Sequence, residues 1–136
     1  MAALVVDPSA ILALAMDDEA ADYAALVLSA IEAGGAAVPS IFWYELRNVL
    51  VVSERRGRIS PERTGAFLAA LAHLPIESTV LPSELGVLQI ARDHSLTVYD
   101  ASYLDLALRR NLPLATLDNR LRAAAGAVGV VLLDDH

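Results

Sequence analysis

The N-terminal segment Leu4-Val5-Val6-Asp7-Pro8-Ser9 joins an apolar, β-branched run to an acid, a proline and a hydroxyl residue. The run from Ala2 to Val6 is typical of a short buried strand. Proline suits the first position of a helix, because its missing N–H would have no partner there. The segment therefore predicts a strand that ends at Asp7 and passes directly into a helix.

The same change from strand to helix repeats along the chain. Pro39-Ser40 follows a minimal strand, so Ser40 is the expected N-cap of a long helix. Strands are predicted at residues 2–6, 36–38, 75–81, 112–117 and 128–133. Helices are predicted from about residues 17 to 31, 40 to 55, 60 to 74, 82 to 94 and 101 to 110, with shorter ones after Pro8 and Asp118.

The strands are short and apolar and do not alternate with polar residues, as expected for a sheet that is covered on both faces. We therefore predict the α/β class: a three-layer α/β/α sandwich with a short, mostly parallel central sheet. In the long helix after Ser40, an apolar stripe of Trp43, Leu46, Val49 and Leu50 is expected to face the core.

Length and composition indicate one domain over residues 1–136. Hydrophobic residues make up 56% of the chain, but no run reaches the length of a membrane helix. The N-terminus lacks the basic residues and long apolar core of a secretory signal, so we expect a cytoplasmic protein without a membrane segment. Cysteine is absent, which excludes disulfides and thiolate metal sites. Any metal must be held by oxygen or imidazole.

The net charge is −7, from 17 acids and 10 bases, which argues against a non-specific nucleic-acid binder. All the bases are arginine, and the absence of lysine excludes Schiff-base catalysis and P-loop phosphate binding. Four arginines cluster around the Gly57 turn: Arg55, Arg56, Arg58 and Arg63. They could guide an RNA backbone, or they could be an ordinary solvated helix end.

Four acids stand where strands are expected to give way to helices. Asp7 follows the first strand, Asp118 follows residues 112–117, and Asp100 follows a short extended stretch at residues 96–99. Glu45 lies about one and a half turns inside a helix, from which its side chain can lean toward the sheet edge. Functional groups of parallel sheets gather at the carboxyl ends of the strands. Carboxylates gathered there repel one another unless a cation neutralises them, and oxygen ligands select Mg²⁺ or Mn²⁺.

Each acid also has a simpler explanation. Asp7 or Asp100 alone could be an N-cap worth about 1 kcal/mol, and Asp118 could cap the helix that follows it. Glu45 alone could be a solvated helix residue. Asp105 is interpreted as part of a surface ion pair with Arg109, four residues along the same helix. Only the joint pattern of the four acids favours a metal site.

Four segments of the chain, in order, resemble a known family: Val5–Ala10, Trp43–Leu50, Tyr99–Leu104 and Leu114–Asp118. The chain resembles a PIN-domain ribonuclease of the VapC type, the toxin half of a bacterial type II toxin–antitoxin pair. The similarity spans nearly the whole chain. It implies a PIN-like fold and a metal-dependent endoribonuclease that cuts single-stranded RNA with Mg²⁺ or Mn²⁺.

By this resemblance, Asp7 and Asp100 are the principal metal ligands, while Glu45 and Asp118 complete the cluster and orient the attacking water. Ser9 and Thr116 are candidate hydroxyls for hydrogen bonds to a carboxylate or a metal-bound water, although local capping explains them equally well. Asn48, one turn beyond Glu45, could steady Glu45 or touch substrate, and Arg55, Arg56 and Arg58 are candidate RNA contacts.

The expected partners are an RNA substrate, a cognate antitoxin and a second copy of the chain. The apolar helices near the N-terminus could supply the protein-binding surface, with Tyr23, Leu26, Phe42 and Trp43 available. The alternative function is a catalytically silent PIN-like module that only binds RNA or a partner. A phosphorylatable receiver-like domain is disfavoured, because the chain lacks lysine and an acidic pair after the first strand.

Overall fold

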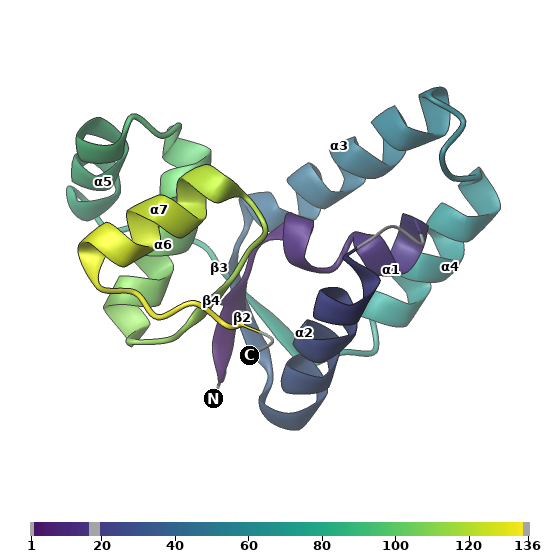
Figure 1. The fold of residues 1–136 in the computed structure, drawn as a ribbon, viewed down its shortest axis with the longest axis horizontal. Helices are drawn as coiled ribbons and strands as arrows, with labels where there is room; N and C mark the ends of the chain where they lie inside the picture. Colours follow the sequence, from purple (N-terminus) through teal and green to yellow (C-terminus); the bar gives the residue numbers. More distant parts are fainter. Residues whose placement is uncertain (1, 17–19, 135–136) are drawn as a thin grey trace.

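A computed structural model describes residues 2–16 and 20–134 of the chain, and its centre is a parallel sheet (Figure 1). The strands are β1 (Leu4–Val6), β2 (Ala36–Pro39), β3 (Ile76–Thr79) and β4 (Leu114–Ala115), in the order β3-β2-β1-β4. All three strand pairs are parallel. In the register, Val5 lies opposite both Ala37 and Leu114, so β1 is an interior strand with every residue buried.

The helices form a layer on each side of this sheet (Figure 1). On one side lie the 3-10 turn η1 (Pro8–Ala10), α1 (Ala13–Met16), α2 (Ala21–Gly34), α3 (Ile41–Arg55) and α4 (Pro61–Leu71). On the other side lie α5 (Gly86–His94), α6 (Val98–Arg110) and α7 (Asn119–Val128). The predicted three-layer α/β/α class is therefore confirmed. None of the helices in residues 2–16 and 20–134 combines the length and apolar character needed to cross a bilayer.

The core lies where α3 and α6 pack on the sheet. Phe42, Leu46 and Leu50 of α3 and Tyr103 and Leu104 of α6 are fully buried. Close packing also constrains Gly34 at the end of α2, because a Cβ there would lie 2.6 Å from the Cβ of Ala3. This glycine allows α2 to turn directly into β2 against the start of β1.

The expected core stripe of α3 is half wrong. Leu46 and Leu50 are buried as expected, but Val49 is 37% exposed and Trp43 is only partly buried, while Phe42 and Ser53 complete the buried face. Consecutive aromatic residues at positions 42–44 make the helical phase ambiguous in the sequence, and packing against the sheet selects Phe42. Some of the four residues available for a protein-binding surface had to be core instead, and these are Phe42 and Tyr23, which are both buried.

Several expected boundaries also differ. Ser40 is not a side-chain N-cap, because its backbone is already helical (φ −57, ψ −28) and its side chain makes no capping bond. Of the extended stretch expected at residues 96–99, Thr97 has an extended backbone (φ −66, ψ 158) and caps α6, but Val98 and Tyr99 already belong to that helix. Among the described residues up to 134, strand pairing near the C-terminus covers Leu114–Ala115 and one bridge from Leu114 to Leu132, and α7 reaches Val128. The helix start expected at Asp17-Asp18-Glu19 lies outside the described residues.

Candidate active site

Asp7 lies at the carboxyl end of β1, with 8% of its surface exposed. Its backbone N–H continues the ladder to β4 by donating to the carbonyl of Ala115. Its Oδ2 accepts hydrogen bonds from Ser9 Oγ at 2.5 Å and Thr116 Oγ1 at 2.8 Å. Asp7 makes no capping bond to η1, so the structure does not support the capping explanation for this acid. A buried carboxylate that does not cap a helix needs another explanation.

The loop after β4 is hydrogen-bonded to the same two hydroxyls that bind Asp7. Ser9 Oγ accepts a bond from the backbone N–H of Leu117, and Thr116 Oγ1 accepts one from the N–H of Asp118. The side chain of Asp118 caps α7, because its Oδ1 accepts from the N–H groups of Arg120 and Leu121. The capping role considered for Asp118 is therefore present, and it fixes the carboxylate beside the end of β4.

Asp100 lies in the first turn of α6 and does not cap it. Thr97 performs that role, since its Oγ1 accepts from the Asp100 N–H at 3.0 Å. The helix start thus orders the backbone that carries Asp100, while its carboxylate takes no part in the cap.

Glu45 is half-buried on α3, and Tyr103 of α6 donates a hydrogen bond of 2.5 Å to its Oε1. Glu45 is therefore not the solvated helix residue that its sequence context allowed. Sequence reasoning missed Tyr103. The available signal was a tyrosine in the apolar face of a predicted helix, because a buried tyrosine hydroxyl usually requires a partner.

The four acids repel one another. Burial raises the pKa of Asp7; the hydroxyls of Ser9 and Thr116 oppose that rise, and the charges of Asp118 and Asp100 add to it. Burial likewise raises the pKa of Glu45, opposed by the Tyr103 hydroxyl and reinforced by Asp7 and Asp100. The pKa of Asp100 is raised by burial and by Asp118. Each acid is thus coupled to at least two of the others, which unites four distant parts of the sequence in one negative cluster.

Within residues 2–16 and 20–134, no three acidic or imidazole side chains are already drawn close enough together to hold one metal ion. The donor chemistry nevertheless fits a hard divalent cation, since the cluster offers only carboxylate oxygens. Burial is the main cause of the raised pKa values of Asp7, Glu45 and Asp100, and a bound cation would offset the further rise that comes from the neighbouring carboxylates.

The remaining candidates lie outside this cluster. Asn48 is exposed one turn beyond Glu45. Arg55, Arg56 and Arg58 are exposed around the far end of α3 (Figure 1), and Arg55 is about 15 Å from Glu45 along the helix axis at 1.5 Å per residue. Arg63 differs from these three, because its Nε donates to the backbone carbonyl of Ala15.

Asp105 was expected at the surface, and that expectation is wrong. Its ion pair with Arg109 is present at 3.1 Å, but the residue is only 2% exposed. Its carboxylate also accepts from Ser83, at 3.1 Å from the backbone N–H and at 2.5 Å from Oγ. The loop before α5 covers this face of α6, and helical spacing alone could not reveal that cover.

Comparisons with known proteins agree with this architecture. Residues 4–127 match the model of the family described as PIN domain. The chain is 33% identical over 122 residues to Ribonuclease VapC3 of Pyrobaculum aerophilum, covering 87% of this chain and 91% of that protein. It is also similar to the crystal structure of PAE2754 from Pyrobaculum aerophilum, with a TM-score of 0.71, 28% identity, and coverage of 90% of this chain and 84% of that one.

Proposed function

Because this chain belongs to the PIN-domain family, we propose that it is a Mg²⁺- or Mn²⁺-dependent endoribonuclease that hydrolyses phosphodiester bonds of RNA at Asp7, Glu45, Asp100 and Asp118. The observation that carries the proposal is the buried carboxylate of Asp7, which shares the hydroxyl of Thr116 with the backbone N–H of Asp118 and lies close enough to Glu45 and Asp100 for their charges to interact. Similarity to a protein named a ribonuclease supports RNA as the substrate.

In this proposal, Asp7 and Asp100 are the principal ligands of the cation, and Glu45 and Asp118 complete the set. A bound divalent cation supplies positive charge that activates water and offsets the charge that builds up on the phosphate. The chain supplies the positions of the ligands. Ser9 and Thr116 both bind Oδ2 of Asp7, which fixes the carboxylate at one oxygen and allows it to present the other.

Glu45 is assigned to the attacking water. The Tyr103 hydroxyl donates to one oxygen of its carboxylate, which favours the ionised form and restricts rotation of the side chain. An ionised, oriented carboxylate can align a water and accept a proton from it. Asp118 is held at the N-terminus of α7 by its own capping bonds, so its carboxylate is ordered before substrate binds.

The biological role proposed here is that of the toxin in a toxin–antitoxin pair, because the curated relative carries the VapC name. A cognate antitoxin, homodimer formation and the cytoplasmic location expected from the sequence belong to the same proposal. Arg55, Arg56 and Arg58 stay as proposed contacts to the RNA backbone.

The decisive experiment incubates the purified protein with structured and unstructured RNAs in Mg²⁺, Mn²⁺ or EDTA. We expect cleavage of single-stranded RNA that requires the cation, with Asp7→Asn as the inactive control. Metal-independent cutting would contradict the assignment of the acids. No cleavage by a folded protein would favour the silent RNA- or partner-binding module.

A further inference from the structure

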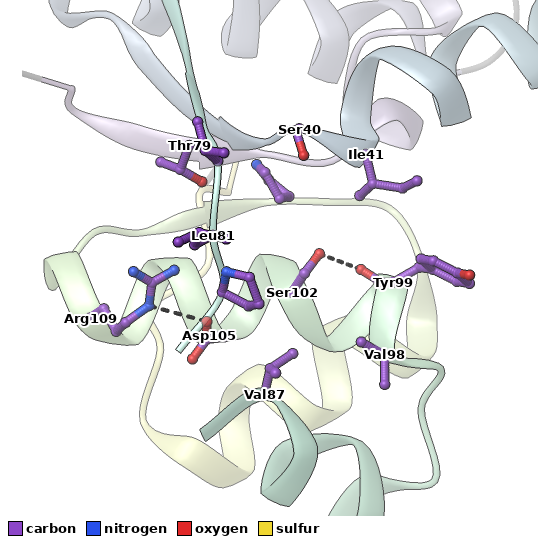
Figure 2. A pocket seen from close by; sticks show the side chains of 13 residues that line it. Ser40, Ile41, Thr79, Leu81, Val87, Val98, Tyr99, Ser102, Asp105 and Arg109 are labelled. Carbon is purple, nitrogen blue, oxygen red and sulfur yellow. Dashed lines mark hydrogen bonds and ion pairs between the residues drawn. The ribbon is translucent and has the colours of Figure 1, made fainter. Parts of the chain in front are cut away.

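A cavity of about 270 Å³ lies at the carboxyl ends of β2 and β3 (Figure 2). Ser40 and Ile41 after β2, the segment at residues 79–82 after β3, and Tyr99 and Ser102 in the first turns of α6 contribute to its lining. Asp7 and Asp118 follow β1 and β4, and none of the four acids is among the residues that line the cavity. The proposed function therefore makes no use of this cavity.

The cavity and the acids share two helices. Ile41 lies four residues before Glu45 on α3, and Tyr99 lies four residues before Tyr103 on α6, a spacing that places side chains on one helix face. Glu45 and Tyr103 are themselves hydrogen-bonded. The strands β1 and β2 are paired at the usual spacing of about 5 Å. The cavity after β2 and the acid after β1 are therefore close enough for one RNA strand to contact both.

The size and walls of the cavity suit a flat, partly apolar group. Sites for whole small molecules usually occupy about 300–1,000 Å³, so a cavity of about 270 Å³ has room for one base. Its mouth carries large exposed side chains: Tyr99 is 60% exposed, Leu81 is 75% exposed and Val98 is 44% exposed. Proteins that bind single-stranded RNA stack unpaired bases on aromatic side chains of this kind.

The polar groups of the cavity favour a neutral ligand. Arg109 donates from Nε to the buried carboxylate of Asp105, so the two charges offset each other (Figure 2). Arg109 lies ten residues beyond Tyr99 on α6, about 15 Å along the helix at 1.5 Å per residue, so it lines the opposite end of the cavity. A phosphate or an acidic peptide would gain less, because the arginine is already paired.

The wall formed by the segment after β3 is anchored. Asp105 accepts two bonds from Ser83, and Ser83 Oγ in turn accepts from the N–H of Val87 at the start of α5. These contacts tie the end of that segment to α5 and α6. The cavity is therefore largely formed before any ligand enters, which lowers the entropy lost on binding.

We propose that this cavity is a nucleobase subsite that takes one unpaired base of the RNA, in a nucleotide that flanks the cleaved bond. Tyr99 stacks on the base, and Ile41, Leu81 and Val98 supply apolar walls of the cavity. The inference rests on the proposed function and extends it by naming the part of the substrate that is recognised next to the acids.

The test uses a short single-stranded RNA that the wild-type protein cuts once, together with a series that carries one abasic nucleotide at each position around the cut. We expect wild-type kcat/KM to fall by about 5-fold or more at one flanking position, as expected for one stacked base. Tyr99→Ala is expected to lose this sensitivity at that position, and Leu81→Ala to reduce it. Tyr44→Ala is the matched control, since Tyr44 is 74% exposed on α3 and lies outside the cavity lining.

A wild-type profile with no sensitive position, or one that Tyr99→Ala leaves unchanged, overturns the proposal. If Tyr99→Ala alters the mass of the protein in solution but not the abasic profile, the cavity faces a second copy of the chain instead. If the wild type cuts no RNA, the proposed function fails separately. Fluorescence anisotropy of the intact and abasic RNAs then decides the subsite, and equal affinities overturn it.

Discussion

The hydroxyl of Tyr103 donates to Oε1 of Glu45 at 2.5 Å and thereby joins α6 to α3 across residues that are 58 positions apart. The ring of Tyr103 is fully buried, and its own pKa is raised by burial and by the carboxylate it contacts. The phenol is therefore a permanent donor at neutral pH. It holds the acid that we assign to the attacking water.

Tyr103→Phe is expected to lower kcat for RNA cleavage by roughly 10-fold or more while KM changes little, because a hydrogen bond to a charged group contributes about 1.5–3 kcal/mol. The ring and its packing are preserved, so the fold should persist. Steady-state kinetics over a range of pH measures the effect. Tyr23→Phe is the matched control, because the Tyr23 hydroxyl donates to the carbonyl of Leu133 and not to the acids. Equal losses in the two variants would contradict a specific role for Tyr103.

Asp100→Asn is expected to abolish cleavage and to relieve growth arrest on expression, while the fold is retained or becomes more stable. The Asp100 carboxylate is repelled by Asp118 and itself repels Glu45, so removing its charge should not lower the stability. Activity assays paired with thermal unfolding of the same preparation measure both effects. Full activity in a folded Asp100→Asn protein would remove this residue from the site.

In the metal-free protein, the contribution of the acid cluster to the free energy of unfolding is expected to be smaller at neutral pH than at about pH 5. Burial and mutual repulsion raise the folded-state pKa values of Asp7, Glu45 and Asp100 above their unfolded values. Folding is therefore favoured by these groups at low pH, and that contribution is lost as the pH rises through the folded-state pKa values.

Melting temperatures in EDTA and in Mg²⁺ measure this dependence. The Mg²⁺-induced rise in Tm should be larger at pH 7.5 than at pH 5, because the cation binds the ionised carboxylates. Asp100→Asn should reduce both the pH dependence and the rise. A rise in Tm that is equal at the two pH values would contradict metal binding by these acids.

Gly86→Ala is expected to destabilise the protein by about 1–3 kcal/mol, as overpacking does. A Cβ at Gly86 would lie 2.7 Å from Ser83 Oγ and 3.1 Å from Asp105 Oδ1, which would disturb the bonds that anchor the segment before α5. Gly65→Ala in α4 is the control, because a Cβ there meets no other atom within 4 Å. That change should stabilise by up to about 1 kcal/mol through helix propensity. Urea unfolding of the two variants gives the comparison, and a stabilised Gly86→Ala protein would rule out the close approach.

The sequence alone was sufficient for the α/β class and for several helix starts, because these depend on neighbouring residues. Val6-Asp7-Pro8 ends a strand and begins a helical turn by local chemistry, and Ser60 caps α4 as its position before Pro61 predicts. Asp7, Asp100 and Asp118 could be named from the same signals, since each follows an expected strand or extended stretch, whereas Glu45 could be named only as a helix residue able to lean toward the sheet edge.

Only the tertiary structure decided how those acids are held and what surrounds them. The bonds from Thr116 to Asp7 and from Tyr103 to Glu45 join residues 109 and 58 positions apart. The buried face of α3 and the burial of Asp105 depend in the same way on which element packs against each helix. Helical spacing gives the faces a helix can present, but the face that is buried is chosen by long-range packing, which local propensity does not encode.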